Sequence, residues 1–182
     1  ILVISVQFYF GHKYLPFSER QFVYPRHEVF DALQNNAGSD RFWSYGDAYI
    51  HANFATQYGV YSPDGTDALF PSWLAELFCA AGEGKPCETL PRIDVMIPRA
   101  SSGESLEANP FRLRLLALTG TKYIVAFEAP GPGPRNEVRG KPGGTKWDMK
   151  AFPEALPRVF VTNRFIVEPE KDARLRRIYA KD

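Results

Sequence analysis

The residues best suited to chemistry lie between positions 41 and 70, where aromatic rings alternate with amides and carboxylates. A pyranose ring has apolar faces and a rim of hydroxyl groups, so it binds where rings lie beside hydrogen-bonding side chains. The same mixture also occurs where side-chain hydrogen bonds hold a long loop against a fold, which is the more common case. The candidate glycan-binding residues are Trp43, Tyr45, Asn53, Gln57, Tyr58, Asp64 and Asp67.

No catalytic motif is recognisable elsewhere in the chain. His12, His27 and His51 are scattered and lack the paired spacing of zinc ligands, and there is no Gly-x-Ser-x-Gly sequence. Residues 140–146, GKPGGTK, resemble a phosphate-binding loop, but a threonine replaces the second glycine and a loop precedes them instead of a strand. We therefore predict no catalytic residue, no metal site and no cofactor.

Two pairs of residues leave alternatives open. Cys79 and Cys87 could close a short loop as a disulfide, which would suit an oxidising compartment, or remain two free thiols. Asp64 and Asp67, in the sequence SPDGTD, could offer oxygen ligands to calcium. Pro-Asp-Gly is also an ordinary turn sequence, and the turn is the simpler interpretation.

The composition is that of a globular domain and excludes several classes of protein. The 182 residues suffice for one domain, and a formal net charge of +1 gives no field that would attract nucleic acid. The sequence has no run of 18 apolar residues, so no segment is expected to span a bilayer. Because the sequence begins at Ile1 without a methionine, we expect it to be a piece of a longer protein.

Hydrophobic periodicity predicts alternating strands and helices. We expect helices beginning near Pro25, Pro71 and Asn109 and a charged one at 170–179; residues 48–58 could form a weaker helix or an irregular turn. Four prolines and five glycines between 129 and 146 predict a surface loop. The pattern predicts a single domain over residues 1–182, of the α/β or α+β class, with helices packed on a mixed β-sheet. The expected strands are 4–10, 41–45, 93–97, 122–127 and 158–167.

Three parts of the sequence, in this order, resemble the large extracytoplasmic domain of YfhO-family bacterial membrane proteins. The first is FWSYGDAYI at 42–50 followed by NFATQYGVYSPDGTDALFP at 53–71. The second, LLALTGTKYIV at 115–125, is similar to that family's leucine-rich helix, glycine, Lys-Tyr and apolar strand. The third, ALPRVFVTN at 155–163, is similar to its late Leu-Pro-Arg strand. The loop at 129–146 and the lack of an Asp-Leu pair near Val6 and Gln7 depart from the family pattern.

The resemblance implies a soluble, extracytoplasmic domain of a protein embedded in the bacterial cell membrane and similar to GT-C glycosyltransferases. Such enzymes transfer a sugar from a polyprenyl-phosphate carrier, and their catalytic carboxylate lies near the membrane helices, upstream of this domain. The chain is then a non-catalytic accessory domain that positions a cell-surface glycan acceptor. Its expected partners are its own transmembrane helices and a cell-envelope glycan or lipid-linked sugar. The alternative function is a structural or protein-interaction module without catalysis.

Overall fold

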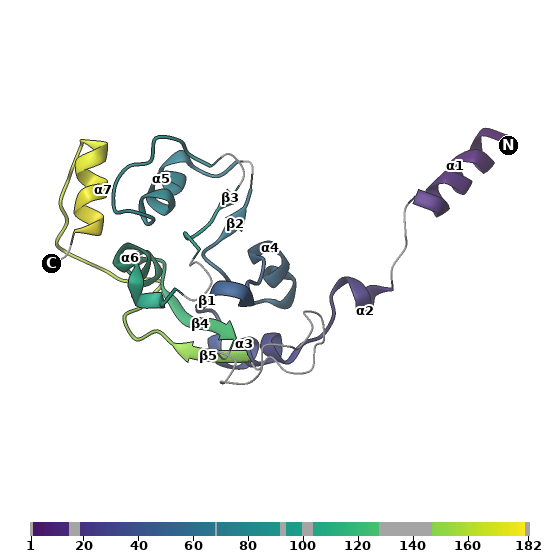
Figure 1. The fold of residues 1–182 in the computed structure, drawn as a ribbon, viewed down its shortest axis with the longest axis horizontal. Helices are drawn as coiled ribbons and strands as arrows, with labels where there is room; N and C mark the ends of the chain where they lie inside the picture. Colours follow the sequence, from purple (N-terminus) through teal and green to yellow (C-terminus); the bar gives the residue numbers. More distant parts are fainter. Residues whose placement is uncertain are drawn as a thin grey trace.

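The computed structural model describes residues 2–14, 19–67, 69–91, 94–99, 104–127 and 147–180. These residues form a single α+β domain with a mixed three-stranded sheet and a small two-stranded sheet (Figure 1). The larger sheet has the order β1 (Arg41–Ser44), β4 (Thr121–Phe127), β5 (Trp147–Ala151), with β1 parallel and β5 antiparallel to β4. The smaller sheet pairs β2 (Gly65–Thr66) with β3 (Asp94–Val95) in antiparallel fashion.

The described residues form seven α-helices and three short 3-10 helices. The α-helices are α1 (Leu2–Tyr14), α2 (Arg20–Val23), α3 (Glu28–Ala37), α4 (Ala52–Ala55), α5 (Ser72–Ala80), α6 (Pro110–Leu118) and α7 (Lys171–Tyr179). Three short 3-10 turns are η1 (Gly46–Ala48), η2 (Thr56–Tyr58) and η3 (Leu106–Ala108). Residues 48–58, for which a weaker helix or an irregular turn was possible, are thus divided among η1, α4 and η2.

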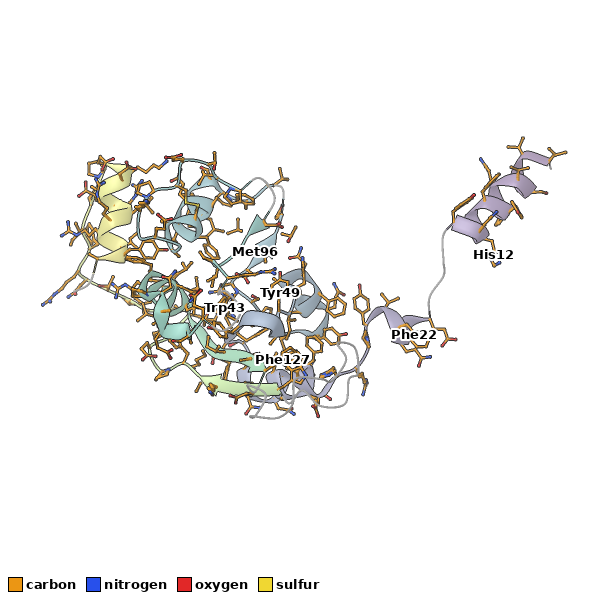
Figure 2. The ribbon with its side chains drawn as sticks, viewed as in Figure 1. His12, Phe22, Trp43, Tyr49, Met96 and Phe127 are labelled. Atoms are coloured by element: carbon orange, nitrogen blue, oxygen red, sulfur yellow. A yellow bond between two sulfur atoms is a disulfide. The ribbon has the colours of Figure 1, made fainter. Side chains whose placement is uncertain are left out.

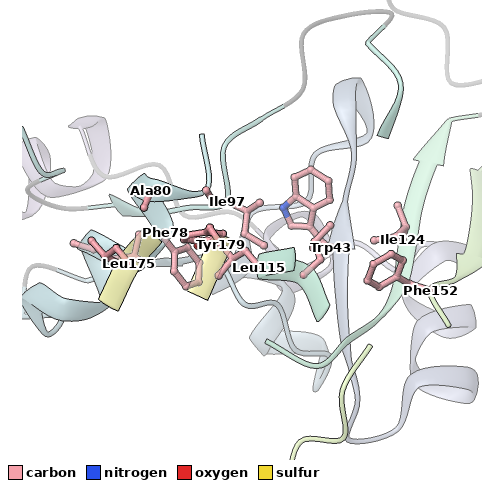
Figure 3. Close-up of a cluster of buried hydrophobic side chains, with 13 residues drawn as sticks. Trp43, Phe78, Ala80, Ile97, Leu115, Ile124, Phe152, Leu175 and Tyr179 are labelled. Carbon is pink, nitrogen blue, oxygen red and sulfur yellow. The ribbon is translucent and has the colours of Figure 1, made fainter. Parts of the chain in front are cut away.

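Each face of the larger sheet packs against its own hydrophobic core, because neighbouring strand residues point to opposite faces. Trp43 and Ile124 join the first core, which includes side chains of α5, α6 and α7 (Figure 3). Phe42 and Val125, one position away in each strand, join the second core with side chains of α3 and α4. The residues that follow β1 are therefore divided between the first core and the second core, one on each face of the sheet.

Helix α6 begins and ends at the residues that the sequence predicts, whereas α3 begins later than expected. Asn109 caps α6 by accepting a hydrogen bond from the Arg112 backbone N–H at 2.9 Å, and Pro110 is the first helical residue. Gly120 follows α6 with a φ of 65°, a conformation that other residues rarely adopt. The helix expected from Pro25 begins later, at Glu28, where the side chain of His27 accepts a hydrogen bond from the Val29 N–H.

The strand expected at residues 4–10 is wrong, because this segment belongs to helix α1. Apart from Ser5 and Gln7, residues 2–10 are apolar, and so short an apolar run fits a helix as well as a strand. Helix α1 buries no residue and stands apart from the rest of the described chain, as the place of His12 shows (Figure 2). Among the described residues, no helix combines the length and the apolar character needed to cross a membrane.

The strand expected at 158–167 is also wrong. This stretch belongs to neither sheet, and β5, which was not among the expected strands, takes the position next to β4. β5 has the sequence WDMKA, which alternates apolar and charged residues as a strand with one solvated face does. Its pairing partner β4 holds it through five opposed residue pairs, from Tyr123–Ala151 to Phe127–Trp147.

Candidate functional site

A buried carboxylate joins three segments of the first core. Asp64 is 7% exposed, and its Oδ2 accepts a hydrogen bond from the Trp43 indole Nε1–H at 3.1 Å. Its Oδ1 accepts one from the Ile97 backbone N–H at 2.7 Å. Asp64 thereby connects β1, the turn before β2 and the chain that follows β3.

The electrostatics of Asp64 follow from its burial. Removal from water raises the pKa of this carboxyl to about 6, although the hydrogen bonds from Ile97 and Trp43 oppose the shift. A raised carboxyl pKa in a cleft would suggest general acid chemistry. Here both carboxylate oxygens already accept hydrogen bonds from the protein, so the role of Asp64 in this arrangement is to hold the three segments together.

The small β2–β3 sheet carries a polar network on the surface beside Asp64. Asn53 is held against Thr66 by two hydrogen bonds, from Nδ2 to the Thr66 carbonyl at 2.8 Å and from the Thr66 N–H to Oδ1 at 3.2 Å. The Thr66 hydroxyl donates to Asp94 at 2.8 Å and lies 3.4 Å from His51 Nε2. Asn53 thus holds α4 against strand β2.

Tyr45 lies at the other side of Trp43, with ring centroids 5.9 Å apart. Near it is Arg112, which is 1% exposed and pairs with Glu104 at 2.5 Å. The Tyr45 hydroxyl and Arg112 Nε are buried without a hydrogen-bond partner among the described residues. Arg112 is not part of any motif in the sequence; its one signal is an arginine on the buried face of α6, one turn before Leu115 and Leu116.

Gln57 and Tyr58 lie on the opposite face of the sheet, in a groove of about 1020 Å³. The rings of Phe30 and Tyr58 stack with centroids 3.8 Å apart, and the Tyr58 hydroxyl donates to the Pro25 carbonyl at 2.8 Å. Gln57 is exposed at the edge of the groove. The groove is lined by Gln21, Phe22, Tyr24, Pro25, Arg26, His27, Phe30, Asp31, Gln34, Gln57 and Tyr58.

Asp67 and the two cysteines lie outside both cores. Asp67 is exposed and accepts a hydrogen bond from the Leu69 N–H at 2.8 Å, the arrangement of an Asx-turn. Among the described residues, no group of three or more His, Cys, Asp or Glu is placed to hold a metal ion. Cys79 and Cys87 form a disulfide, with Cα atoms 6.1 Å apart.

The seven candidate glycan-binding residues therefore do not surround one cleft. Trp43, Tyr45 and Asp64 come together in or beside the first core, whereas Gln57 and Tyr58 face the groove beside α3. Figure 2 places Trp43 and Tyr49 within the folded body. Comparisons with protein-family models, with curated proteins and with solved structures give no match to this chain.

Proposed function

We propose that this chain is the extracytoplasmic, non-catalytic accessory domain of a membrane-embedded, glycosyltransferase-like protein that uses a polyprenyl-phosphate sugar. In this proposal α1 enters the bilayer, and the groove beside α3 holds a cell-surface glycan acceptor near the membrane-embedded site. The disulfide supports an oxidising compartment outside the cytoplasm. The order of the three sequence segments that resemble the YfhO family supports the identity of the parent.

Helix α1 is the observation that carries the proposal. Its apolar side chains are exposed on every side, with Leu2, Ile4 and Phe8 all more than half exposed. A helix that is apolar all round is stable in a protein core or in lipid, whereas a helix that docks on a protein surface has one polar face. Its only charged or titratable groups other than tyrosine, His12 and Lys13, lie at the end next to Tyr14, as in the interfacial belt of membrane helices.

The bilayer contact predicts binding that depends on apolar side chains and not on charge. The protein should float with lipid vesicles at both low and 0.5 M salt, roughly independent of anionic lipid. The Ile4→Asp/Phe8→Asp variant should lose on the order of 100-fold in partitioning, because burying each large apolar side chain contributes roughly 1.5–3 kcal/mol. Flotation in a density gradient measures the bound fraction.

The matched control is Leu69→Asp, which changes an apolar side chain that is 89% exposed but lies outside α1. This variant should float like the unchanged protein. Equal flotation of the α1 double variant and of the unchanged protein would refute membrane attachment through α1.

The groove beside α3 supports the placement of a glycan. Tyr24 and Phe22 expose ring surface along it, and the amides of Gln21 and Gln57 supply hydrogen-bonding groups at its edge. Rings beside amides suit the apolar face and hydroxyl rim of a sugar. The groove begins at Gln21, seven residues after Tyr14, so a glycan in it would lie close to the bilayer that α1 enters.

Titration with cell-wall glycan fragments tests this placement. NMR shifts should change for the backbone amides near Tyr24 and Gln57 at millimolar glycan, and Gln57→Ala should weaken binding by about three- to tenfold through loss of a hydrogen bond. Asp67→Asn, which alters an exposed polar residue outside the groove, should bind like the unchanged protein. If no shifts change near the groove, the glycan role fails while membrane attachment stands.

The second candidate function is a structural or protein-interaction module. The specific observation in its favour is the internal use of Asp64, Trp43 and Asn53, whose polar atoms bind one another or the backbone. These contacts hold the loop at 41–70 in place without a ligand. The glycan titration separates the two functions, because this module predicts no shift change in the groove.

A further inference from the structure

Residues 158–168 form a surface segment that belongs to none of the helices or strands of the described chain. In the described part of the chain, no backbone-to-backbone hydrogen bond involves residues 157–169. The apolar side chains of this segment are nevertheless large and open to solvent; Val161 is 98% exposed and Phe165 is 82% exposed. Backbone groups that make no backbone-to-backbone hydrogen bond, together with exposed apolar side chains, form a template for another strand.

Both ends of the segment are fixed to the domain. The Leu156 N–H donates to the Ala117 carbonyl of α6 at 3.0 Å. At the other end, Glu170 caps α7, and the Tyr179 hydroxyl of that helix donates to the Leu77 carbonyl of α5 at 2.6 Å. A segment held at both ends is already ordered in part, so pairing costs less conformational entropy than it would for a loose tail.

We infer that residues 158–168 pair in antiparallel fashion with the same segment of a second copy, around a two-fold axis at Asn163. The sequence is self-complementary in this register. Apolar residues oppose apolar residues, and the terminal arginine opposes the terminal glutamate. The opposed pairs are Arg158 with Glu168, Val159 with Val167, Phe160 with Ile166, Val161 with Phe165, and Thr162 with Arg164.

Each of these pairs occurs twice, because the two strands are identical. The register thus gives two opposite-charge pairs and six apolar pairs, and it places no like charges opposite each other. Opposed residues share a face, so Val159, Val161, Phe165 and Val167 of both copies form one apolar stripe. The charge complementarity at both ends favours a second copy over an unrelated apolar strand.

Two local contacts change when the copies pair. The chain bends at Asn163, where the Thr162 hydroxyl accepts from the Arg164 N–H at 3.1 Å, and pairing straightens this bend. Arg158 donates through Nη1 to the Ser39 carbonyl, but a guanidinium has five N–H donors and can bind a partner's carboxylate as well. Because a two-stranded ribbon is marginal by itself, the dimer is concentration-dependent.

Cysteine crosslinking in the full chain tests the register. The membrane-contacting α1 is kept in mild detergent in every sample, and Asn163→Cys should form an intermolecular disulfide because residue 163 opposes itself. Val159→Cys is the control: it is equally a surface position, but two copies of residue 159 would lie about 26 Å apart at 3.3 Å per residue. Equal crosslinking at both positions, or none at residue 163, overturns the pairing.

A charge exchange tests the same register without new cysteines. Arg158→Glu places two carboxylates opposite each other at both ends of the ribbon and should weaken dimerisation on the order of tenfold in sedimentation equilibrium. The double variant Arg158→Glu/Glu168→Arg restores opposite charges and should recover most of the loss. A single variant that dimerises like the unchanged protein, or a double variant that stays as weak as the single one, overturns the proposal.

Discussion

Replacing Asp64 by asparagine should remove a pH dependence of about 3 kcal/mol from the free energy of unfolding. The folded-state pKa of Asp64 is about 6, whereas an exposed aspartate has a value of 3.8. The folded protein therefore holds this proton more tightly than the unfolded chain. The contribution of Asp64 to the free energy of unfolding is therefore fully present below pH 3.8 and is lost as the pH rises through 6.

The direction of this effect is opposite to that of a carboxylate in an ion pair. The charged form of Asp64 stays folded at neutral pH because the Trp43 indole and the Ile97 N–H donate to it. An asparagine keeps the shape of the side chain, but its single carbonyl oxygen can serve only one of these donors. The pH dependence comes from the proton instead: the folded protein binds it more tightly than the unfolded chain, so the gap in unfolding free energy between the unchanged protein and the variant should be largest at about pH 4.

Urea unfolding at several pH values between 4 and 7 measures this difference. The gap in unfolding free energy between the unchanged protein and Asp64→Asn should narrow as the pH rises from 4 to 7, by most of the expected value of about 3 kcal/mol. Asp67→Asn, three residues along the chain and exposed, is the matched control for the substitution itself. A flat gap for Asp64→Asn would mean that Asp64 titrates like a solvated carboxyl.

The sequence predicted those elements whose ends carry local signals. Asn109 and Pro110 set the beginning of α6 through backbone chemistry that acts within one turn, so the prediction did not depend on the rest of the fold. The parallel pairing of β1 with β4 depends on contacts between residues about 80 positions apart. It followed only from the fold class, because the predicted alternation of strands and helices favours a mixed sheet.

The errors came from segments where a strand-like pattern had no strand partner. Residues 158–167 have a strong strand composition, yet β5 occupies the edge next to β4. A strand forms only where another backbone offers hydrogen bonds, and no single-segment pattern contains that information. Helix α1 shows the same limit, since its apolar side chains would suit any dry environment.

The sequence predicted which residue types gather between positions 41 and 70, but not how the fold arranges them. Trp43 and Tyr58 are both rings near amides and carboxylates in the sequence, but the sheet lies between the cores that they join. Adjacent strand residues diverge, so a stretch that crosses β1 divides between two faces. What the composition did indicate was a loop held by side-chain hydrogen bonds, as with Asn53 and Asp64.

Loss of the Cys79–Cys87 disulfide should lower the free energy of unfolding by about 2.5 kcal/mol, the chain-entropy value for a loop this short. Reduction should correspondingly lower the melting temperature by about 5–10 °C for a chain of this size. The effect arises mostly in the unfolded state, because the folded loop has a second anchor. The Asn109 side chain donates to the Ala81 and Gly82 carbonyls, both at 3.1 Å, so the loop should stay docked on α6 after reduction.

Thermal melting with and without dithiothreitol, on the unchanged protein and on Cys79→Ser/Cys87→Ser, tests both parts of this argument. The double variant should melt like the reduced protein and should not respond to dithiothreitol. Asn109→Ala in the reduced background removes the second anchor and the α6 cap together, and should cost more than the roughly 1 kcal/mol that a helix cap contributes alone. If the loop has no second anchor, Asn109→Ala should lower the free energy of unfolding by the cap's contribution only. A melting temperature that reduction leaves unchanged would show that the disulfide adds no stability.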